Sequence, residues 1–162
     1  LVSRKPLYSP DMMPVFELMA DTGKWLVIHA GTAPYPNEFT QLRFLEELLE
    51  RVPGLRVILA HMGGYEYEKA LELMDRFPDL RLDTTMIFVD TYVFDSAYPF
   101  PAERLEPYRD RILFGSDFPN IPYDYREAVR GLTSFGFDDD FLKKIFRDNA
   151  AGLFGLENSR EV

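Results

Sequence analysis

The sequence predicts an α/β fold in which a parallel sheet alternates with helices. Four short apolar runs have the continuous apolar character of strands that are buried on both faces. Segments with helical spacing of their apolar residues separate these runs. The runs begin at residues 25, 55, 80 and 111, and steps of 25 to 31 residues match one strand and one helix each. Such alternation requires crossover connections and therefore produces a parallel sheet.

The four predicted strands are too short to be buried helices, and none has the strict alternation of a half-exposed strand. They are residues 25–29 (WLVIH), 55–61 (LRVILAH), 80–86 (LRLDTTM) and 111–116 (RILFGS).

Five helices are predicted from apolar residues that recur on one face of each segment. Ser9, Asn37, Asp124 and the acidic residues 138–140 are the expected amino-terminal caps or favourable first-turn charges. The predicted helices are residues 11–20, 38–52, 65–77, 125–135 and 139–154.

The longest irregular segment, residues 87–102, follows the third strand and is rich in aromatic residues. A loop of this length is often functional, which is one interpretation. The other interpretation is that its aromatic rings pack over the end of the sheet. Its aromatic residues are Phe88, Tyr92, Phe94, Tyr98 and Phe100.

Composition excludes several functional classes. The 162 residues contain no cysteine, which rules out disulfides, thiol nucleophiles and iron–sulfur clusters. The net charge of −9 disfavours nucleic acid as a partner. No apolar stretch has the length of a membrane span, and the start does not resemble a signal peptide, so we expect a cytoplasmic protein without a membrane partner. Neither a serine-hydrolase elbow nor a dinucleotide-binding or P-loop motif is present.

Both histidines of the chain end predicted strands. His29 ends the first strand, His61 ends the second, and Asp117 follows the fourth. The carboxyl ends of parallel strands lie at one edge of the sheet, so these three side chains are expected to converge there. Imidazole and carboxylate are suitable ligands for Zn²⁺, Fe²⁺ or Mn²⁺. Taken singly, each residue also has a structural interpretation, for example a turn role for Asp117 before Pro119.

Three protein ligands leave a metal ion with open positions, where it can lower the pKa of bound water and polarise a carbonyl group. His61 or Asp117 is the expected base. Asp83, on the third strand, can also reach the site, but a hydrogen-bonded structural role beside Thr84 and Thr85 is favoured.

Five segments together resemble a known family: WLVIHAG, VILAHMGG, RLDTT, ILFGSDFP and DNAAGLFGL. They resemble the amidohydrolase-related TIM-barrel family of metal-dependent hydrolases, in the branch that contains aminocarboxymuconate-semialdehyde decarboxylase. The resemblance runs from about residue 14 to residue 156. It implies that this chain is the C-terminal half, about four βα units, of a (β/α)₈ TIM barrel. Residues 1–162 then form a single partial-barrel domain with strands five to eight and a C-terminal helix.

The resemblance also implies roles for individual residues. His29 corresponds to a metal ligand on the fifth strand, and His61 to a catalytic or metal-binding residue on the sixth. Asp117 corresponds to the residue on the eighth strand that contacts the metal, expected to be Zn²⁺, and handles a proton. Residues 83–85 fall on the seventh strand, without a metal role. Tyr35 and Phe88 are expected to bind the substrate, a small molecule such as a carboxylic acid or a lactone.

One departure from the family is large, because the HxH pair of its first strand is absent from this sequence. A chain with half of the ligand set is expected to bind the metal poorly. Its terminal strands are expected to expose unpaired edges. We therefore expect a homo-oligomer, or a larger protein whose N-terminal half is not in this sequence.

Three functions are consistent with these observations. The first is a metal-dependent hydrolase that acts through a metal-activated water, with a metal-dependent decarboxylase of the same family as the alternative. The second is a catalytically inactive remnant that folds by self-association. A doubly wound binding domain is a weaker third, because it leaves the placement of His29, His61 and Asp117 as coincidence.

Overall fold

The computed structural model describes residue 5 and residues 7–33, 38–89 and 98–156. Within it the chain divides into two compact units, residues 1–82 and residues 83–162. Among the described helices, none combines the length and the apolar character that crossing a bilayer requires.

The strands confirm the predicted α/β class. They are β1 (Trp25–Ile28), β2 (Arg56–Leu59), β3 (Leu80–Asp83) and β4 (Ile112–Leu113), in the order β1-β2-β3-β4. The β1–β2 and β2–β3 pairs are parallel, with Val27 opposite Ile58 and Ile58 opposite Arg81. Each strand lies inside its predicted range and is shorter.

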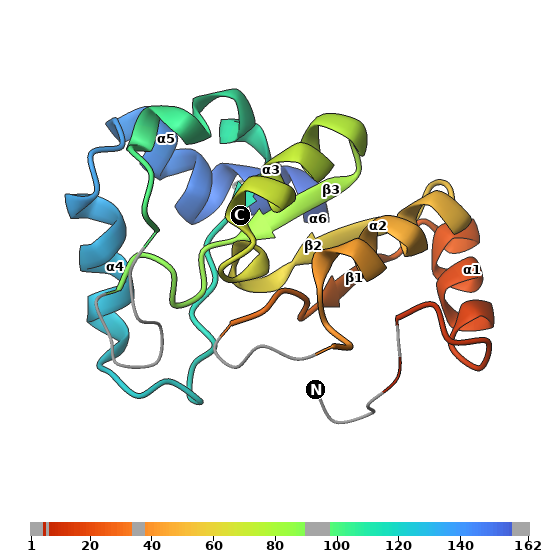
Figure 1. The fold of residues 1–162 in the computed structure, drawn as a ribbon. Helices are drawn as coiled ribbons and strands as arrows, with labels where there is room; N and C mark the ends of the chain where they lie inside the picture. Colours follow the sequence, from red (N-terminus) through yellow and green to blue (C-terminus); the bar gives the residue numbers. More distant parts are fainter. Residues whose placement is uncertain (1–4, 6, 34–37, 90–97, 157–162) are drawn as a thin grey trace. The chain divides into compact units, whose positions relative to one another are not determined.

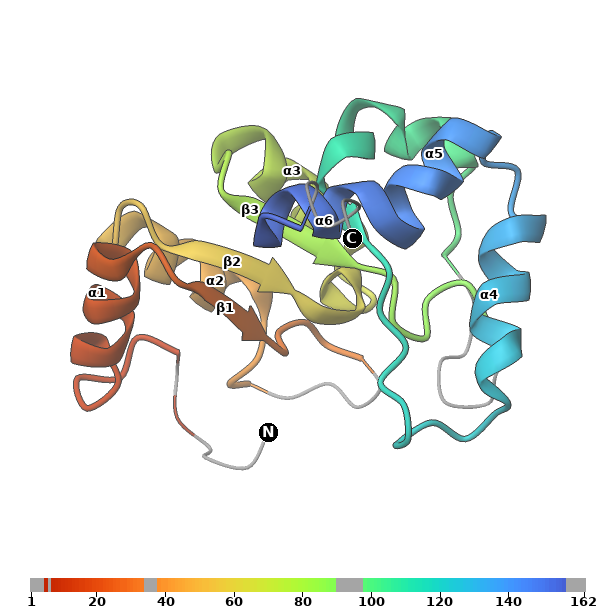
Figure 2. The same ribbon diagram turned by 180° about the vertical axis from the view of Figure 1, so that it is seen from behind.

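In the first unit, the α-helices are α1 (Met13–Thr22), α2 (Leu42–Arg51) and α3 (Tyr67–Arg76), and a short 3₁₀ segment, η1 (Ala60–Gly63), follows β2. Helices α2 and α3 lie on one face of β1 and β2, as Figures 1 and 2 show from opposite sides. Val57 and Leu59 of β2 and Leu80 and Leu82 of β3 are all fully buried. By contrast, the side chain of Val27 on β1 is 64% exposed.

Two of the helix starts differ from the sequence prediction. Ser9 does not cap α1; it lies in the preceding turn, where its carbonyl oxygen accepts a hydrogen bond from the Met12 N–H at 2.9 Å. Asn37 lies outside the described residues. The first N–H of α2, on Leu42, instead donates to the Glu66 carboxylate at 3.2 Å. This cap comes from a residue 24 positions along the chain, which helical spacing does not reveal.

The second unit contains β4 and a mainly helical C-terminal part. Its helices are η2 (Ala102–Arg111, 3₁₀), α4 (Tyr125–Ser134), α5 (Asp139–Lys143), η3 (Lys144–Asp148, π) and α6 (Asn149–Phe154). Asp124 precedes α4 as expected and caps it, with its carboxylate accepting from the Arg126 N–H at 2.9 Å. Asp138, expected as a favourable charge at the start of its helix, also caps α5 by accepting from the Phe141 N–H at 2.6 Å. Helix η2 was not predicted, because Pro107 lies inside it.

The aromatic residues after β3 form part of the core of the second unit. The ring of Phe88 lies 4.7 Å from that of Phe135 and 5.7 Å from that of Tyr98, measured between centroids. Phe88 and Tyr98 are 5% and 4% exposed. For these two residues the structure supports the packing interpretation of the segment, whereas Tyr92 and Phe94 lie outside the described residues.

Candidate functional site

The carboxyl end of β1 presents His29 to solvent. His29 follows the last residue of the strand and is exposed. Side chains two positions apart on a strand share a face, so His29 extends the face on which Val27 is exposed. An imidazole here is accessible to a ligand that approaches this end of the strand.

His61 lies in a tight turn directly after β2 and is 7% exposed. Its backbone is left-handed, with φ 56° and ψ 27°, and Met62 follows with φ 50° and ψ 28°. Each such conformation costs about 1–3 kcal/mol for a residue that carries a Cβ. The turn is closed by a hydrogen bond from the Gly64 N–H to the His61 carbonyl oxygen at 2.8 Å. The turn places His61 directly after β2 with its side chain buried.

The two histidine rings contact each other, as their matching strand ends predicted. Their centroids are 4.6 Å apart and their planes are inclined by 61° in an edge-to-face arrangement. The structure therefore brings together two of the three residues expected to carry the chemistry, and both belong to the first unit.

The loops behind these histidines are packed backbone to backbone. A Cβ atom added to Gly31 would lie 1.8 Å from the Gly63 carbonyl oxygen, so no side chain fits at position 31. Gly31 also exchanges two hydrogen bonds with Thr40, one of 2.6 Å to its carbonyl and one of 2.7 Å from its hydroxyl. This packing anchors the residues that follow His29 against the turn that carries His61.

In the second unit, the Asp83–Thr85 segment holds the end of β4. The Thr84 N–H donates to the Leu113 carbonyl at 3.0 Å, and the Thr84 hydroxyl accepts from the Gly115 N–H at 3.2 Å. The Asp83 carboxylate accepts from the Thr85 N–H at 3.0 Å. These contacts give Asp83 a structural role, which is the role that the sequence favoured.

Asp117 follows this segment in the loop after β4. It is exposed and has a left-handed backbone, with φ 58°. A positive φ is uncommon outside glycine, although Asp tolerates it better than most residues. The backbone of Asp117 is held by a hydrogen bond from the Asn120 N–H at 2.8 Å.

Tyr123 is a neighbour of Asp117 that the sequence reasoning missed. Its hydroxyl is buried, and burial together with the charge of Asp117 raises the pKa of this group. The nearby Met86 backbone opposes the increase without completing a hydrogen bond of normal geometry. The sequence contains nine tyrosines, and no local pattern distinguishes this one.

Of the two residues expected to bind substrate, the structure describes one. Tyr35 lies outside the described residues. Phe88 is described, and its ring belongs to the aromatic core of the second unit. The Phe88 carbonyl oxygen also touches α4, where a Cβ on Gly131 would lie 1.9 Å away. Substrate binding by either residue stays a prediction.

A metal site can be tested against the donors that the described chain supplies. His29 and His61 provide two adjacent imidazoles, but no group of three or more potential ligands occurs among the described residues. A catalytic zinc site ordinarily has three protein ligands. The described residues thus supply two donors and do not by themselves form a complete metal site.

Comparison with known proteins identifies a decarboxylase as a relative. Over 99 residues the chain is 34% identical to 6-methylsalicylic acid decarboxylase from Penicillium expansum. This match covers 54% of the chain and 30% of the relative.

Solved structures of low sequence identity share the fold. The chain matches an uncharacterised TIM-barrel protein from Bordetella bronchiseptica with a TM-score of 0.77 and 20% identity, over 95% of this chain and 53% of that one. It matches 2,6-dihydroxybenzoate decarboxylase from Rhizobium with a TM-score of 0.63 and 20% identity, over 94% and 58%. A dihydroxybenzoic acid decarboxylase from Polaromonas, solved with manganese and 2-nitroresorcinol, matches with a TM-score of 0.58 and 18% identity, over 94% and 56%.

The chain spans little more than half the length of these three solved structures, the first of which is a TIM barrel. The fold is accordingly that of about half a TIM barrel. The family model named Amidohydrolase matches residues 2–156, nearly the whole sequence. The chain therefore belongs to the amidohydrolase family.

Proposed function

We propose that the chain contributes half of the catalytic site of a metal-dependent enzyme that acts on a small carboxylic acid. The edge-to-face contact of His29 and His61 at the ends of β1 and β2 carries this proposal. Two imidazoles held at one place are suitable donors for Zn²⁺ or Mn²⁺. Manganese in a decarboxylase of the same fold supports a divalent ion without deciding which one.

The residues of this chain have separate proposed roles. His29 is exposed and is the proposed metal donor. His61 is buried and its ring contacts that of His29, and its proposed role is to contact the substrate or to transfer a proton. Asp117 is proposed as a further metal donor and proton acceptor. A divalent ion bound to such donors polarises a substrate oxygen atom and lowers the pKa of water.

Two reactions remain as candidates. Decarboxylation is favoured, because the 34% identical relative and two of the matched structures are named as decarboxylases of aromatic acids. Hydrolysis through an activated water is the second candidate, and it is supported by the family to which the chain belongs.

We also propose that this half-barrel functions with further strands, either in a second copy or in a longer protein. On the described part of the chain, β1 pairs only with β2, and Val27 in the middle of β1 is 64% exposed. Exposed strand edges and apolar strand faces favour association. A monomer with cooperative unfolding at micromolar concentration, measured by sedimentation and urea titration, would contradict self-association.

Metal binding by the chain is the direct test of the proposed site. Mn²⁺ added to the chain should bind weakly, as a loss of the free-ion signal in electron paramagnetic resonance shows. His29→Ala should abolish this binding, whereas Asp21→Asn on α1, which removes an exposed carboxylate elsewhere, should leave it unchanged. Equal Mn²⁺ binding by the parent chain and His29→Ala would remove His29 as a ligand.

The reaction is tested by release of CO₂ from 6-methylsalicylate or 2,6-dihydroxybenzoate, compared with opening of a lactone, in the presence of Mn²⁺ or Zn²⁺. CO₂ release that depends on His61 and Asp117 supports decarboxylation, and lactone opening supports hydrolysis. A third outcome would identify an inactive remnant. In that case the chain binds no metal, has neither activity and unfolds cooperatively as a dimer.

A further inference from the structure

A cavity of 340 Å³ lies in the first unit, at the end of the strands opposite to the histidines. It opens between the carboxyl ends of α2 and α3 and the starts of β2 and β3. Leu49, Val52, Leu55 and Phe77 form its apolar lining, and Glu50 and Asp79 are the acidic residues among those that line it. None of the residues predicted for catalysis or metal binding lines this cavity.

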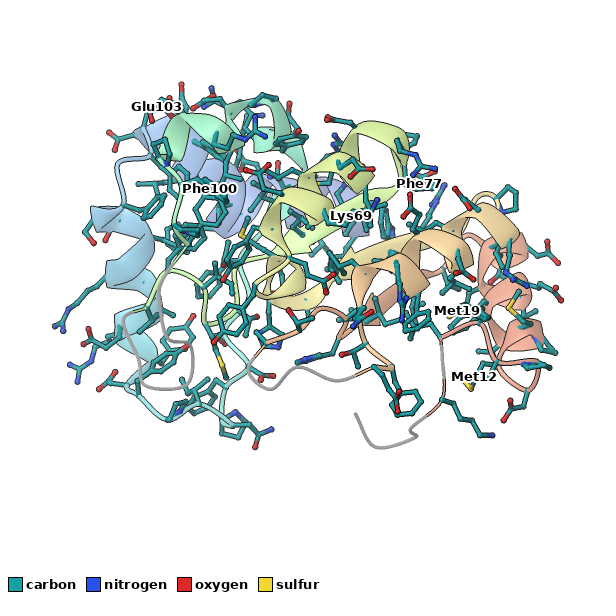
Figure 3. All side chains as sticks on the ribbon, in the orientation of Figure 1. Met12, Met19, Lys69, Phe77, Phe100 and Glu103 are labelled. Carbon is teal, nitrogen blue, oxygen red and sulfur yellow. The ribbon has the colours of Figure 1, made fainter. Side chains whose placement is uncertain are left out.

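The cavity has buried walls and an open mouth. Leu49, Val52 and Leu55 are 5%, 4% and 2% exposed, so they belong to the packed interior. Phe77, labelled in Figure 3, follows the last residue of α3 and is half-buried. At Gly54 an added Cβ would meet no atom within 4 Å, which leaves this side of the cavity accessible. The apolar walls suit a hydrocarbon or aromatic body.

The polar groups around this lining are predominantly negative. Asp79 has no hydrogen bond or ion pair from its carboxylate within the part of the chain that the structure describes. Helices α2 and α3 both end here, and helix carboxyl ends carry partial negative charge on unpaired carbonyl oxygens. Glu50 is already paired, because it accepts a hydrogen bond from Arg76 at 2.6 Å.

Two cationic side chains of the first unit, Arg76 and Arg81, contact residues that line the cavity. The Arg76 guanidinium lies 5.2 Å from the centroid of the Phe77 ring, within the range of a cation–π contact. The Arg81 guanidinium donates to the Pro78 carbonyl oxygen at 2.6 Å and to the Leu80 carbonyl oxygen at 3.2 Å. Among the described residues, neither guanidinium forms an ion pair with the Asp79 carboxylate. A ligand with an apolar body and a positively charged group would fill the cavity and form an ion pair with the Asp79 carboxylate.

We propose that this cavity binds a small organic cation, namely a protonated primary amine on an aromatic or aliphatic body. The ammonium group donates hydrogen bonds to the Asp79 carboxylate and to carbonyl oxygens at the helix ends. The body packs against Leu55 and Phe77. Anions of the same size are excluded, because carboxylates and two helix carboxyl ends face them. The site is independent of the proposed metal-dependent function.

Three probes of similar size test the role of charge: phenethylammonium, phenethyl alcohol and 3-phenylpropionate. Each is titrated into ¹⁵N-labelled chain while the amide signals of Gly54, Leu55 and Asp79 are followed by NMR. Phenethylammonium should shift these signals saturably and bind at least about tenfold more tightly than the alcohol, because a charge-assisted hydrogen bond is gained. Equal affinities for the two, or no saturable shift with the ammonium ion, would overturn the proposal.

Variants assign the binding to Asp79. Asp79→Asn should weaken phenethylammonium binding about tenfold or more and leave the alcohol unaffected, whereas Asp79→Glu should retain the preference for the cation. Asp75→Asn, on the last turn of α3 but outside the lining, is the matched control. Undiminished binding by a folded Asp79→Asn would also overturn the proposal. His29→Ala should bind the amine normally, which separates this site from the proposed metal donors.

Discussion

Gly31 and Gly63 lie so close that a Cβ on Gly31 would stand 1.8 Å from the Gly63 carbonyl oxygen. One of these glycines follows His29 by two positions, and the other follows His61 by two. The contact therefore connects the two loops that carry the histidines, and it leaves no space for a side chain.

Replacing Gly31 with alanine should consequently disturb the candidate site as well as the fold. Gly31→Ala should lower the free energy of unfolding by about 3 kcal/mol or more, because the loops must separate. Gly54→Ala is the control, because Gly54 also has a positive φ but an added Cβ there would meet no atom within 4 Å. This substitution should lower the free energy of unfolding by only about 1–2 kcal/mol. Urea unfolding measures both, and equal losses would show that backbone conformation, not the contact, makes Gly31 necessary.

The pKa of the Tyr123 hydroxyl should depend on Asp117. Burial is the larger cause of its raised pKa, and the Asp117 charge adds to it. Asp117→Asn should therefore lower the pKa of Tyr123 while leaving it above its ordinary value. NMR of ¹³Cζ-labelled tyrosine, with Tyr123→Phe to assign the signal, measures this change. An unaltered titration would place the two groups too far apart to interact.

The Glu46 carboxylate should make stability depend on pH. Glu46 on α2 pairs with Lys69 at 2.9 Å and with Arg76, both on α3 (Figure 3 labels Lys69). The hydrogen bond from Lys69 is the main reason that the pKa of Glu46 is lowered. A lowered pKa in the folded state means that this stabilisation is present above the ordinary glutamate pKa and is lost as pH falls through the folded-state value.

Glu46→Gln should accordingly destabilise the chain by about 0.5–1 kcal/mol at pH 7, with a shrinking difference as the solution is acidified. Glu47→Gln is the control, because Glu47 and Arg51 are exposed and 3.7 Å apart. Urea unfolding at a series of pH values gives the comparison, and a difference that grows on acidification would contradict the assigned sign.

Asn149 should contribute strongly to the second unit. Its side-chain amide donates to the carbonyl oxygens of Arg109 and Ile112, each at 2.8 Å. Asn149→Ala should lower the free energy of unfolding by about 1–3 kcal/mol, because both acceptors lose their donor. Asn120→Ala, at an exposed position, should change it by less than about 0.5 kcal/mol. Comparable losses in the two variants would deny Asn149 this bridging role.

The π-helical turn before Asn149 illustrates what the sequence did not reveal. Apolar spacing correctly predicted helical structure over residues 139–154, because Phe141 and Ile145 must be buried. It did not predict that the Asn149 N–H would bond to the Lys144 carbonyl, five residues back. The wider turn accompanies the contacts of the Asn149 side chain with Arg109 and Ile112, and such distant partners leave no mark on local periodicity.

The sequence by itself determined the parallel α/β order, the family and the placement of His29 and His61 at matching strand ends. Strand order and helix faces follow from the spacing of apolar residues, which burial imposes locally. Only the tertiary structure decided that the two rings touch, that His61 sits in a left-handed turn and that Glu66 caps α2. These features depend on the close approach of segments distant in sequence, which steric fit and hydrogen-bond satisfaction decide once the chain has folded.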